Sequence, residues 1–282
     1  MGKVKAVVGN LVSFVALSWV IINLSFWVLL LVPIAIIRFA FPKRWVAGPC
    51  NVVSSLIYHA AIKLNSFWMI HITGIRLNVH GEIGNHPSPI VISNHQSWFD
   101  ICVLQEVIMA KGPILKFLVK RELAWVPVIG WGCVAMNFPL LHRSSGVSAR
   151  TSDFSSLQTA SRDLSNEPGA LLIFVEGTRF TEQKKETQRS PYKHLLKPRV
   201  GGMRILRNTA SPETPVLDIT ISFDKGIRSF WHCLHGEIKR IDITIEQFTL
   251  GDIEDMSQWL KSRWQAKEKI LEAQYRQRIG RD

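Results

Sequence analysis

Cysteine is scarce in this sequence, and its few copies are widely separated. The chain has 282 residues and four cysteines, at positions 50, 102, 133 and 233, with no CxxC pair among them. Four cysteines are too few for a disulfide scaffold in a chain of this length. We therefore expect reduced, buried thiols.

Acidic residues are also few, 22 against 34 lysines and arginines, and the formal net charge is +12. Charged residues make up only 20% of the chain and apolar residues 47%, which excludes a disordered chain. A positive excess favours an anionic partner: nucleic acid, a phospholipid surface or a phosphorylated substrate. The sequence has no P-loop, zinc-finger or helix-turn-helix signature, so we expect no nucleic-acid partner.

Charge is absent from residues 6–37, which are almost entirely apolar. Because about 20 apolar residues cross a bilayer core, residues 1–44 are predicted to form a transmembrane or membrane-embedded helix. A cleaved signal peptide is the alternative, but the run exceeds the usual ~7–15 residues and no small-residue cleavage site follows. Residues 45–73 are predicted to form an amphipathic interfacial helix or, alternatively, the first helix of the globular domain.

Strands and helices alternate in the remaining segment, residues 74–282. Short apolar or alternating runs predict strands at 74–80, 90–93, 134–141, 170–175, 216–223 and 238–245. Helical spacing predicts helices at 97–110, 147–165 and 252–279. This order is typical of an α/β fold, with a sheet covered by helices on both faces.

The loop after the 90–93 strand contains His95 and Asp100. We expect Ser97 to cap the following helix, which places His95 at the carboxyl end of a strand, where open α/β sheets carry their sites. Asp100 could then fold back to one ring nitrogen and leave the other free as a base. The alternative is an ordinary loop histidine beside a helix-capping aspartate.

A second loop, Glu176 to Arg179, follows the 170–175 strand. Gly177 would allow close approach of a ligand, and the planar fork of Arg179 suits a phosphate. Glu176 could hold Arg179 in place or accept a substrate hydroxyl. The alternative is a strand-ending turn with a surface Glu–Arg pair.

Three sequence blocks occur together in one order: Asn94-His95-x4-Asp100; then Lys120-Arg121-Glu122-Leu123 with Pro127 to Gly130; and Phe174 to Arg179. In this respect the chain, over roughly residues 75–245, resembles the lysophospholipid acyltransferase family, which includes 1-acylglycerol-3-phosphate acyltransferases. Residues 194–199 and 216–223 look most like the branch of lysocardiolipin acyltransferases and related bacterial acyltransferases. The fourth block departs from the common Val-Pro-x-x-Pro form, since Pro215-Val216-Leu217-Asp218 is the nearest segment.

The resemblance implies a catalytic domain at 74–282 with a central mixed sheet, and a direct acyl transfer. His95 would be the general base, supported by Asp100, while Glu176, Gly177, Thr178 and Arg179 would bind the acceptor and Lys120 would add positive charge. No metal or cofactor is implied; acyl-CoA or acyl-carrier protein would be the cosubstrate. The expected acceptor is 1-acyl-sn-glycerol-3-phosphate, with lysophosphatidylglycerol or another lysophospholipid as the alternative. We expect a bacterial inner-membrane protein whose catalytic domain faces the cytoplasm.

Other functions have less support in the sequence. A serine hydrolase would need Gly-x-Ser-x-Gly, which is absent. His232-Cys233-x-His235 is too short a spacing, without a completing carboxylate, for a metal site. A non-catalytic membrane adaptor on the same fold remains a rival. Trp98 and Phe99 are expected to pack beneath the site, and Trp125 and Trp131 to line an acyl channel or pack in the core.

Overall fold

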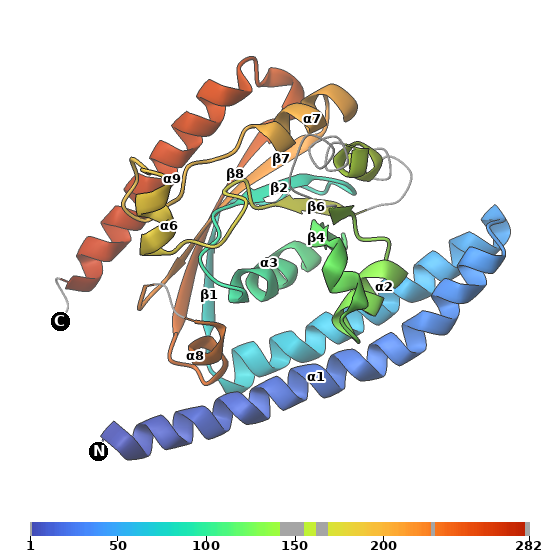
Figure 1. Ribbon diagram of the computed structural model, residues 1–282, viewed down its shortest axis with the longest axis horizontal. Helices are drawn as coiled ribbons and strands as arrows, with labels where there is room; N and C mark the ends of the chain where they lie inside the picture. Colours follow the sequence, from blue (N-terminus) through green and yellow to red (C-terminus); the bar gives the residue numbers. More distant parts are fainter. Residues whose placement is uncertain (1, 142–154, 162–168, 227–228, 280–282) are drawn as a thin grey trace.

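A six-stranded mixed sheet lies at the centre of the fold (Figure 1). The computed structural model describes residues 2–141, 155–161, 169–226 and 229–279. The sheet order is β1-β8-β7-β2-β6-β3, made of β1 (Arg76–His80), β2 (Ile90–Ser93), β3 (Leu115–Phe117), β6 (Ala170–Ile173), β7 (Pro215–Phe223) and β8 (Arg240–Thr249). β7 and β8 pair antiparallel and every other neighbouring pair is parallel. The α/β class predicted from the sequence is therefore confirmed.

Helices cover both faces of the sheet, which explains why its central strands are continuously apolar. Val91 of β2 belongs to the core cluster that contains α3 (Phe99–Met109). Its neighbours Ile90 and Ile92 belong to the opposite cluster, with α7 (Gly201–Thr209), α9 (Met256–Ile279) and a short helix at 155–161. The alternation of side chains along β2 thus divides the core into two layers.

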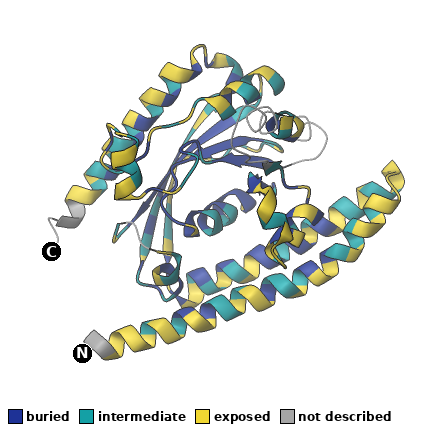
Figure 2. Cartoon of the chain, in the orientation of Figure 1, coloured by how far each residue is buried: buried dark blue, intermediate teal, exposed yellow. Residues whose placement is uncertain are grey.

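The N-terminal region forms a pair of long helices, α1 (Gly2–Ala40) and α2 (Arg44–Phe67), followed by the π-helical turn η1 (Trp68–Ile72). Polar contacts hold α1 along its length: Ser13 Oγ donates to Trp231 O (2.7 Å) and Asn23 Nδ2 donates to Ala61 O (2.9 Å). The outer face of α1 is largely exposed (Figure 2). Val4–Ala40 is long and apolar enough to cross a bilayer. An exposed apolar helix of this length indicates membrane association.

Some predicted elements differ from those observed. The strand predicted at 134–141 is wrong over most of its length, because residues 134 and 135 end helix α4 (Ile129–Ala135) and residues 136–139 form a turn and an irregular segment. Only β5 (Leu140–Leu141) is extended there, paired with β4 (Val119–Lys120) in a separate two-stranded sheet. Of the helix predicted at 147–165, the described residues include only 155–161. The remaining elements are η2 (Arg121–Trp125), α6 (Glu182–Thr187), α8 (Phe230–Leu234) and η3 (Leu250–Asp252).

All four cysteines are free thiols. Cys133 and Cys233 are buried, as predicted. Cys50 and Cys102 are only half-buried, so the prediction of burial is wrong for these two. They lie on α2 and α3, helices that each have one face outside the core.

Candidate active site

Hydrogen bonds from strand β7 and from the loop after β6 hold the loop that follows β2. The buried Asn94 side chain donates to Ile221 O and accepts from Ile221 N, both at 2.9 Å. Its amide group therefore continues the hydrogen bonding of the sheet after the strand itself has ended. His95 O accepts from the Phe180 N–H at 2.7 Å, which joins this loop to the loop after β6. The backbone position of His95 is consequently fixed on both sides.

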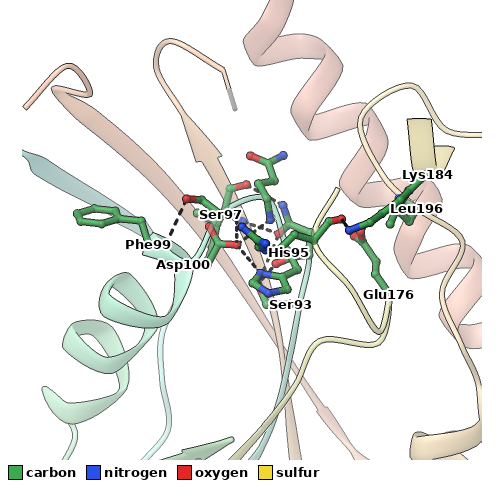
Figure 3. A network of polar contacts seen from close by, with 12 residues as sticks. Ser93, His95, Ser97, Phe99, Asp100, Glu176, Lys184 and Leu196 are labelled. Atoms are coloured by element: carbon green, nitrogen blue, oxygen red, sulfur yellow. Dashed lines mark hydrogen bonds and ion pairs between the residues drawn. The ribbon is translucent and has the colours of Figure 1, made fainter. Parts of the chain in front are cut away.

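His95 and Asp100 form a close pair within this loop (Figure 3). The distance between His95 Nδ1 and Asp100 Oδ2 is 2.9 Å. The same carboxylate oxygen accepts from the backbone N–H groups of Gln96 (2.7 Å) and Ser97 (2.9 Å). Because a carboxylate accepts the hydrogen bond at Nδ1, that nitrogen carries the proton and Nε2 is left with its lone pair.

Ser97 and Asp100 also start helix α3. The Ser97 hydroxyl accepts from the Phe99 N–H at 3.3 Å, while the Asp100 carboxylate reaches back to the Ser97 N–H. Helix α3 begins at Phe99 with Trp98 as its N-cap residue, one residue later than the sequence predicts, and Ser97 supports the first turn through the Phe99 N–H. One carboxylate thus both starts the helix and fixes the histidine.

The Asp100 carboxylate is completely buried. Burial raises the pKa of Asp100, while the hydrogen bond from His95 and the amides of Ser97 and Gln96 oppose this rise. Its Oδ1 atom has no hydrogen-bond partner among the described residues. All of the favourable contacts of this carboxylate therefore lie on the oxygen that faces His95.

Aromatic rings hold the imidazole on two other sides. Phe174 stacks on the His95 ring with a centroid distance of 3.8 Å and an interplanar angle of 10°. Trp98 meets the same ring edge-on at 6.2 Å. The expectation that Trp98 packs beneath the site is wrong, since it is 47% exposed, whereas Phe99 is buried as expected. The His95 side chain is only 9% exposed.

The loop after β6 brings Arg179 to the same place. The Arg179 guanidinium carbon lies 4.8 Å from the centre of the Trp98 ring. Gly177 has a positive φ of 71°, and a Cβ at this position would come within 3.2 Å of the Arg199 side chain. Only glycine can adopt this positive φ, and leave room for the Arg199 side chain, without strain. Thr178 Oγ1 accepts from Lys184 Nζ at 2.8 Å. Two exposed cationic side chains, Arg179 and Arg199, therefore flank one turn.

Glu176 points into the protein rather than toward Arg179. It is completely buried, and its Oε2 accepts from the Leu196 N–H at 3.3 Å. Burial raises the pKa of Glu176 to about 8, with the amides of Leu196 and His95 acting in the opposite direction. Among the described residues Glu176 forms no ion pair with Arg179. The observed contact of this carboxyl group is with the segment around Leu196.

Lys120 lies apart from these residues. It ends strand β4 in the separate two-stranded sheet and is exposed. Within the described ranges it makes no contact with His95, Asp100 or Arg179. The structure thus brings together five sequence-predicted residues, His95, Asp100, Gly177, Thr178 and Arg179, with Glu176 directly beneath them.

Three nearby side chains were not identified from the sequence. Phe174 was noted only as part of a motif, and Arg199 lies in a separate segment. Lys184 belongs to the polar segment 181–190, whose composition predicts a mobile loop, whereas the structure forms helix α6 there. Their proximity depends on long-range folding, since Arg199 N donates to Val175 O at 2.7 Å. A glycine next to an acidic residue at a strand end was the only sequence signal for such a close approach.

In the described part of the chain, no three His, Cys, Asp or Glu side chains converge as a metal site would require. His235 instead shares a hydrogen bond with Ser13 Oγ at 2.7 Å, and His232 with Ser229 Oγ. His235 therefore joins the end of α8 to α1, whereas His232 bonds the residue that caps its own helix, and the two rings meet edge-on with centroids 5.7 Å apart.

The arrangement of a histidine–carboxylate pair and a guanidinium at the carboxyl ends of parallel strands defines a candidate transferase site, and the comparisons give its class. The family model described as acyltransferase matches residues 76–223. The chain belongs to this acyltransferase family. This agrees with the resemblance found in the sequence blocks.

Several known proteins are similar to this chain. Human 1-acyl-sn-glycerol-3-phosphate acyltransferase delta is 31% identical over 180 residues, covering 57% of this chain and 46% of the relative. Lysocardiolipin acyltransferase 1 of Danio rerio is 26% identical over 228 residues, covering 72% of this chain and 57% of the relative. The chain therefore spans about half the length of the curated relatives that it matches. A crystal structure of the 1-acyl-sn-glycerophosphate (LPA) acyltransferase from Thermotoga maritima has the same fold, with a TM-score of 0.59, 18% identity and 97% coverage of both chains.

Proposed function

We propose that this protein is a membrane-bound O-acyltransferase that moves a fatty acyl group from a thioester donor to the free hydroxyl of a lysophospholipid. The donor is acyl-CoA or acyl-carrier protein, and the first acceptor to test is 1-acyl-sn-glycerol-3-phosphate. The observation that carries the proposal is the His95–Asp100 pair, at 2.9 Å, beside the exposed Arg179. Membership of the acyltransferase family supports the type of reaction.

In the first step, His95 Nε2 removes the proton from the acceptor hydroxyl as its oxygen attacks the carbonyl carbon of the thioester. The buried Asp100 carboxylate stabilises the imidazolium that forms, because its Oδ2 faces Nδ1. Stacking on Phe174 limits rotation of the ring during this step. A positioned base of this kind contributes about 10²–10⁴-fold in rate.

In the second step, the tetrahedral intermediate expels the thiolate, which takes the proton back from His95. The ester bond to the acceptor has then formed and the thioester bond has broken, with no net change in the enzyme. Arg179 binds the acceptor phosphate through its planar fork, held over Trp98. Gly177 and Thr178 shape the same binding turn. The buried Glu176 supports the turn from beneath through Leu196. Lys120, in the separate β4–β5 sheet, contributes only to the overall positive charge of the domain.

The acceptor is an amphiphile that stays in the bilayer, which accounts for the apolar N-terminal helix. Contacts from Ser13 to Arg38 along the domain favour a helix that lies with the domain at the membrane over one that leaves it. We place the domain on the cytoplasmic side, where thioester donors are made, in a bacterial inner membrane.

The test is acyl transfer measured by mass spectrometry. Purified protein in detergent is supplied with a mixed panel of lysophospholipids and with both acyl-CoA and acyl-carrier protein. We expect a new diacyl product that identifies acceptor and donor, and its loss in His95→Ala. His80→Ala is the matched control, since His80 is exposed at the end of the edge strand β1.

Two results count against parts of the proposal. A product from lysophosphatidylglycerol alone would replace the default acceptor but keep the reaction. Folded wild-type protein that acylates no acceptor in the panel would favour a membrane adaptor on the same fold, and such a protein would be indifferent to His95→Ala.

A further inference from the structure

An apolar surface outside the candidate active site lies on η2 and α4. Five side chains form it, and we call it the η2–α4 patch: Trp125, Val126, Ile129, Trp131 and Val134. Trp125 is 82% exposed, and the others are exposed as well. The expectation that Trp125 and Trp131 pack in the core is therefore wrong. Soluble surfaces rarely collect large apolar side chains in one short segment.

The backbone of this segment forms a tight turn that directs these side chains outward. Val128 has φ 68° and ψ −68°, a strained conformation for a β-branched residue. A Cβ at Gly130 would lie only 2.0 Å from Leu123 O, so η2 and α4 pack backbone to backbone. The turn is also closed by hydrogen bonds from Gly130 N to Val126 O and from Val126 N to Leu123 O. This tight turn keeps the apolar side chains on the outside.

The patch is attached directly to helix α1. Arg38 Nη2 donates to Ala135 O and to Asn137 Oδ1, both at 3.0 Å, at the end of α4. A Cβ at Gly132 would come within 3.1 Å of Val28 on α1. Beyond these contacts α1 exposes further apolar side chains, including Leu29 and Phe39. In Figure 1 this green segment, below the β4 label, lies next to α1. The patch thus continues the apolar surface of α1.

Charge at the borders of the patch identifies its occupant. Lys120 and Arg121 stand at the start of η2 and are followed by the acidic Glu122, and Arg38 on α1 reaches the end of α4. Tryptophan and basic side chains around an apolar surface are typical of the boundary between lipid headgroups and acyl chains. We propose that the η2–α4 patch inserts into an anionic phospholipid bilayer, as a second membrane contact beside α1.

The proposed contact would attach the domain to the bilayer and orient it, a role that goes beyond acyl transfer. Two contacts on one rigid body define the angle at which the domain meets the lipid, whereas a single helix leaves rotation about its own axis free. Insertion of the patch would hold the β2 and β6 loops at one constant height above the bilayer.

The test uses tryptophan emission from the full chain bound to vesicles of phosphatidylcholine and phosphatidylglycerol with brominated acyl chains. Trp125→Phe and Trp131→Phe are compared with wild type, so that each difference spectrum isolates one residue. Trp259→Phe is the control, because Trp259 lies on α9, on the far side of the sheet from α1, and packs against Phe248. We expect brominated lipid to quench the emission of Trp125 and Trp131 severalfold more than that of Trp259. Equal quenching at all three positions would overturn the proposal.

A second experiment separates membrane insertion from catalysis and from self-association. Val126→Ser combined with Val134→Ser, at two exposed patch residues, should reduce acyl transfer severalfold when the acceptor is embedded in vesicles, and leave transfer to a monomeric short-chain acceptor unchanged. Val79→Ser is the matched control, since Val79 is an exposed apolar residue on β1. A double variant that instead changes the oligomeric state in detergent would contradict a lipid occupant and indicate a second copy of the chain. The quenching result does not depend on activity, so it remains informative if no acceptor is found.

Discussion

Two buried carboxylates in this protein, those of Asp100 and Asp218, are each paired with a nitrogen-bearing side chain but differ in how accessible that partner is. Asp100, at the end of the sheet, is paired with His95. Asp218, within β7, is paired with Lys267, and the distance between Lys267 Nζ and Asp218 Oδ1 is 2.6 Å. Both carboxylates are almost completely inaccessible. The difference lies in the partner: Lys267 is itself completely buried, whereas the His95 side chain is 9% exposed and its ring contacts the exposed Trp98.

The Asp218 pair is closed on every side. Lys267 Nζ also donates to Ile219 O (2.6 Å) and Thr220 Oγ1 (3.2 Å), and Arg263 Nε binds the other carboxylate oxygen at 2.6 Å. Burial lowers the pKa of Lys267, while the Asp218 charge opposes this. The three contacts of the Lys267 ammonium group thus attach α9 to β7. In the Asp100 pair, one ring nitrogen is left for a substrate. Burial of a carboxylate is common to both pairs, and a ring nitrogen without a hydrogen-bond partner among the described residues distinguishes the pair that we propose to be catalytic.

The largest expected effect separates the two pairs by activity. Asp100→Asn should lower kcat by about 10²–10⁴-fold, because an asparagine no longer stabilises the imidazolium or enforces the Nδ1–H tautomer. The measurement is the transfer rate at saturating acceptor, with circular dichroism as the check on folding. A variant that is folded and retains more than a tenth of the wild-type kcat would contradict the role given to Asp100.

Breaking the second pair should affect stability instead. Lys267→Met leaves Asp218 buried with a single cation, and removal of one partner from a buried ion pair costs about 3–5 kcal/mol. Urea unfolding should show this loss in the free energy of unfolding, with kcat per folded molecule nearly unchanged. A large fall in kcat without a loss of stability would mean that the two pairs do not differ as described.

A third buried carboxyl group, that of Glu176, should make the free energy of unfolding depend on pH. Its pKa is raised to about 8 from an ordinary value of 4.5, so the folded state holds its proton more tightly than the unfolded chain. The resulting stability is fully present below pH 4.5 and is lost as the pH rises toward 8. Glu176→Gln should therefore show a smaller decline in unfolding free energy between these pH values, measured by urea titration across the range. Parallel pH profiles for the two proteins would exclude a raised pKa.

The smallest expected effects concern the exposed side of the site. Arg179→Lys keeps the charge but loses the planar fork, so KM for a phosphate-bearing acceptor should rise about tenfold with little change in kcat. Trp98→Leu should raise KM less, by a few-fold, because a cation–π contact contributes only about 0.5–1 kcal/mol at an exposed position. Steady-state kinetics on lysophosphatidate measure both. If kcat falls while KM is constant, Arg179 acts on the transition state rather than on binding.

The parts of the fold that local sequence determines were the more predictable ones. The apolar runs at β2 and β6 predicted buried strands, and the capping pattern around Ser97 and Asp100 predicted the turn that brings His95 onto Asp100. Periodicity failed at 134–141, because residues 134 and 135 end helix α4 and a turn follows. Helix α4 packs against α1, a segment about 100 residues earlier in the chain. It also missed the three-residue strand β3, which is too short to leave a periodic signal.

Side-chain contacts between distant segments could not be predicted. Phe174 stacking on His95, Arg199 lying against Gly177 and Lys267 binding Asp218 each join residues that no local pattern relates. The sequence favoured an outward-facing Glu176, whereas the fold buries it under the loop because Leu196 supplies a backbone donor. Lys120 was grouped with the site by motif order, yet β4 places it in a separate small sheet.

The central claim is direct transfer, with His95 acting as a base on the acceptor hydroxyl. A rapid-quench experiment with an isotopically labelled acyl thioester and an acceptor from the panel tests this during the first turnover, by intact-protein mass spectrometry alongside product analysis. Direct transfer predicts that labelled diacyl lipid appears while the mass of the protein stays constant. A protein that gains the mass of the acyl group before product appears, on Cys102 or any other side chain, would contradict the account.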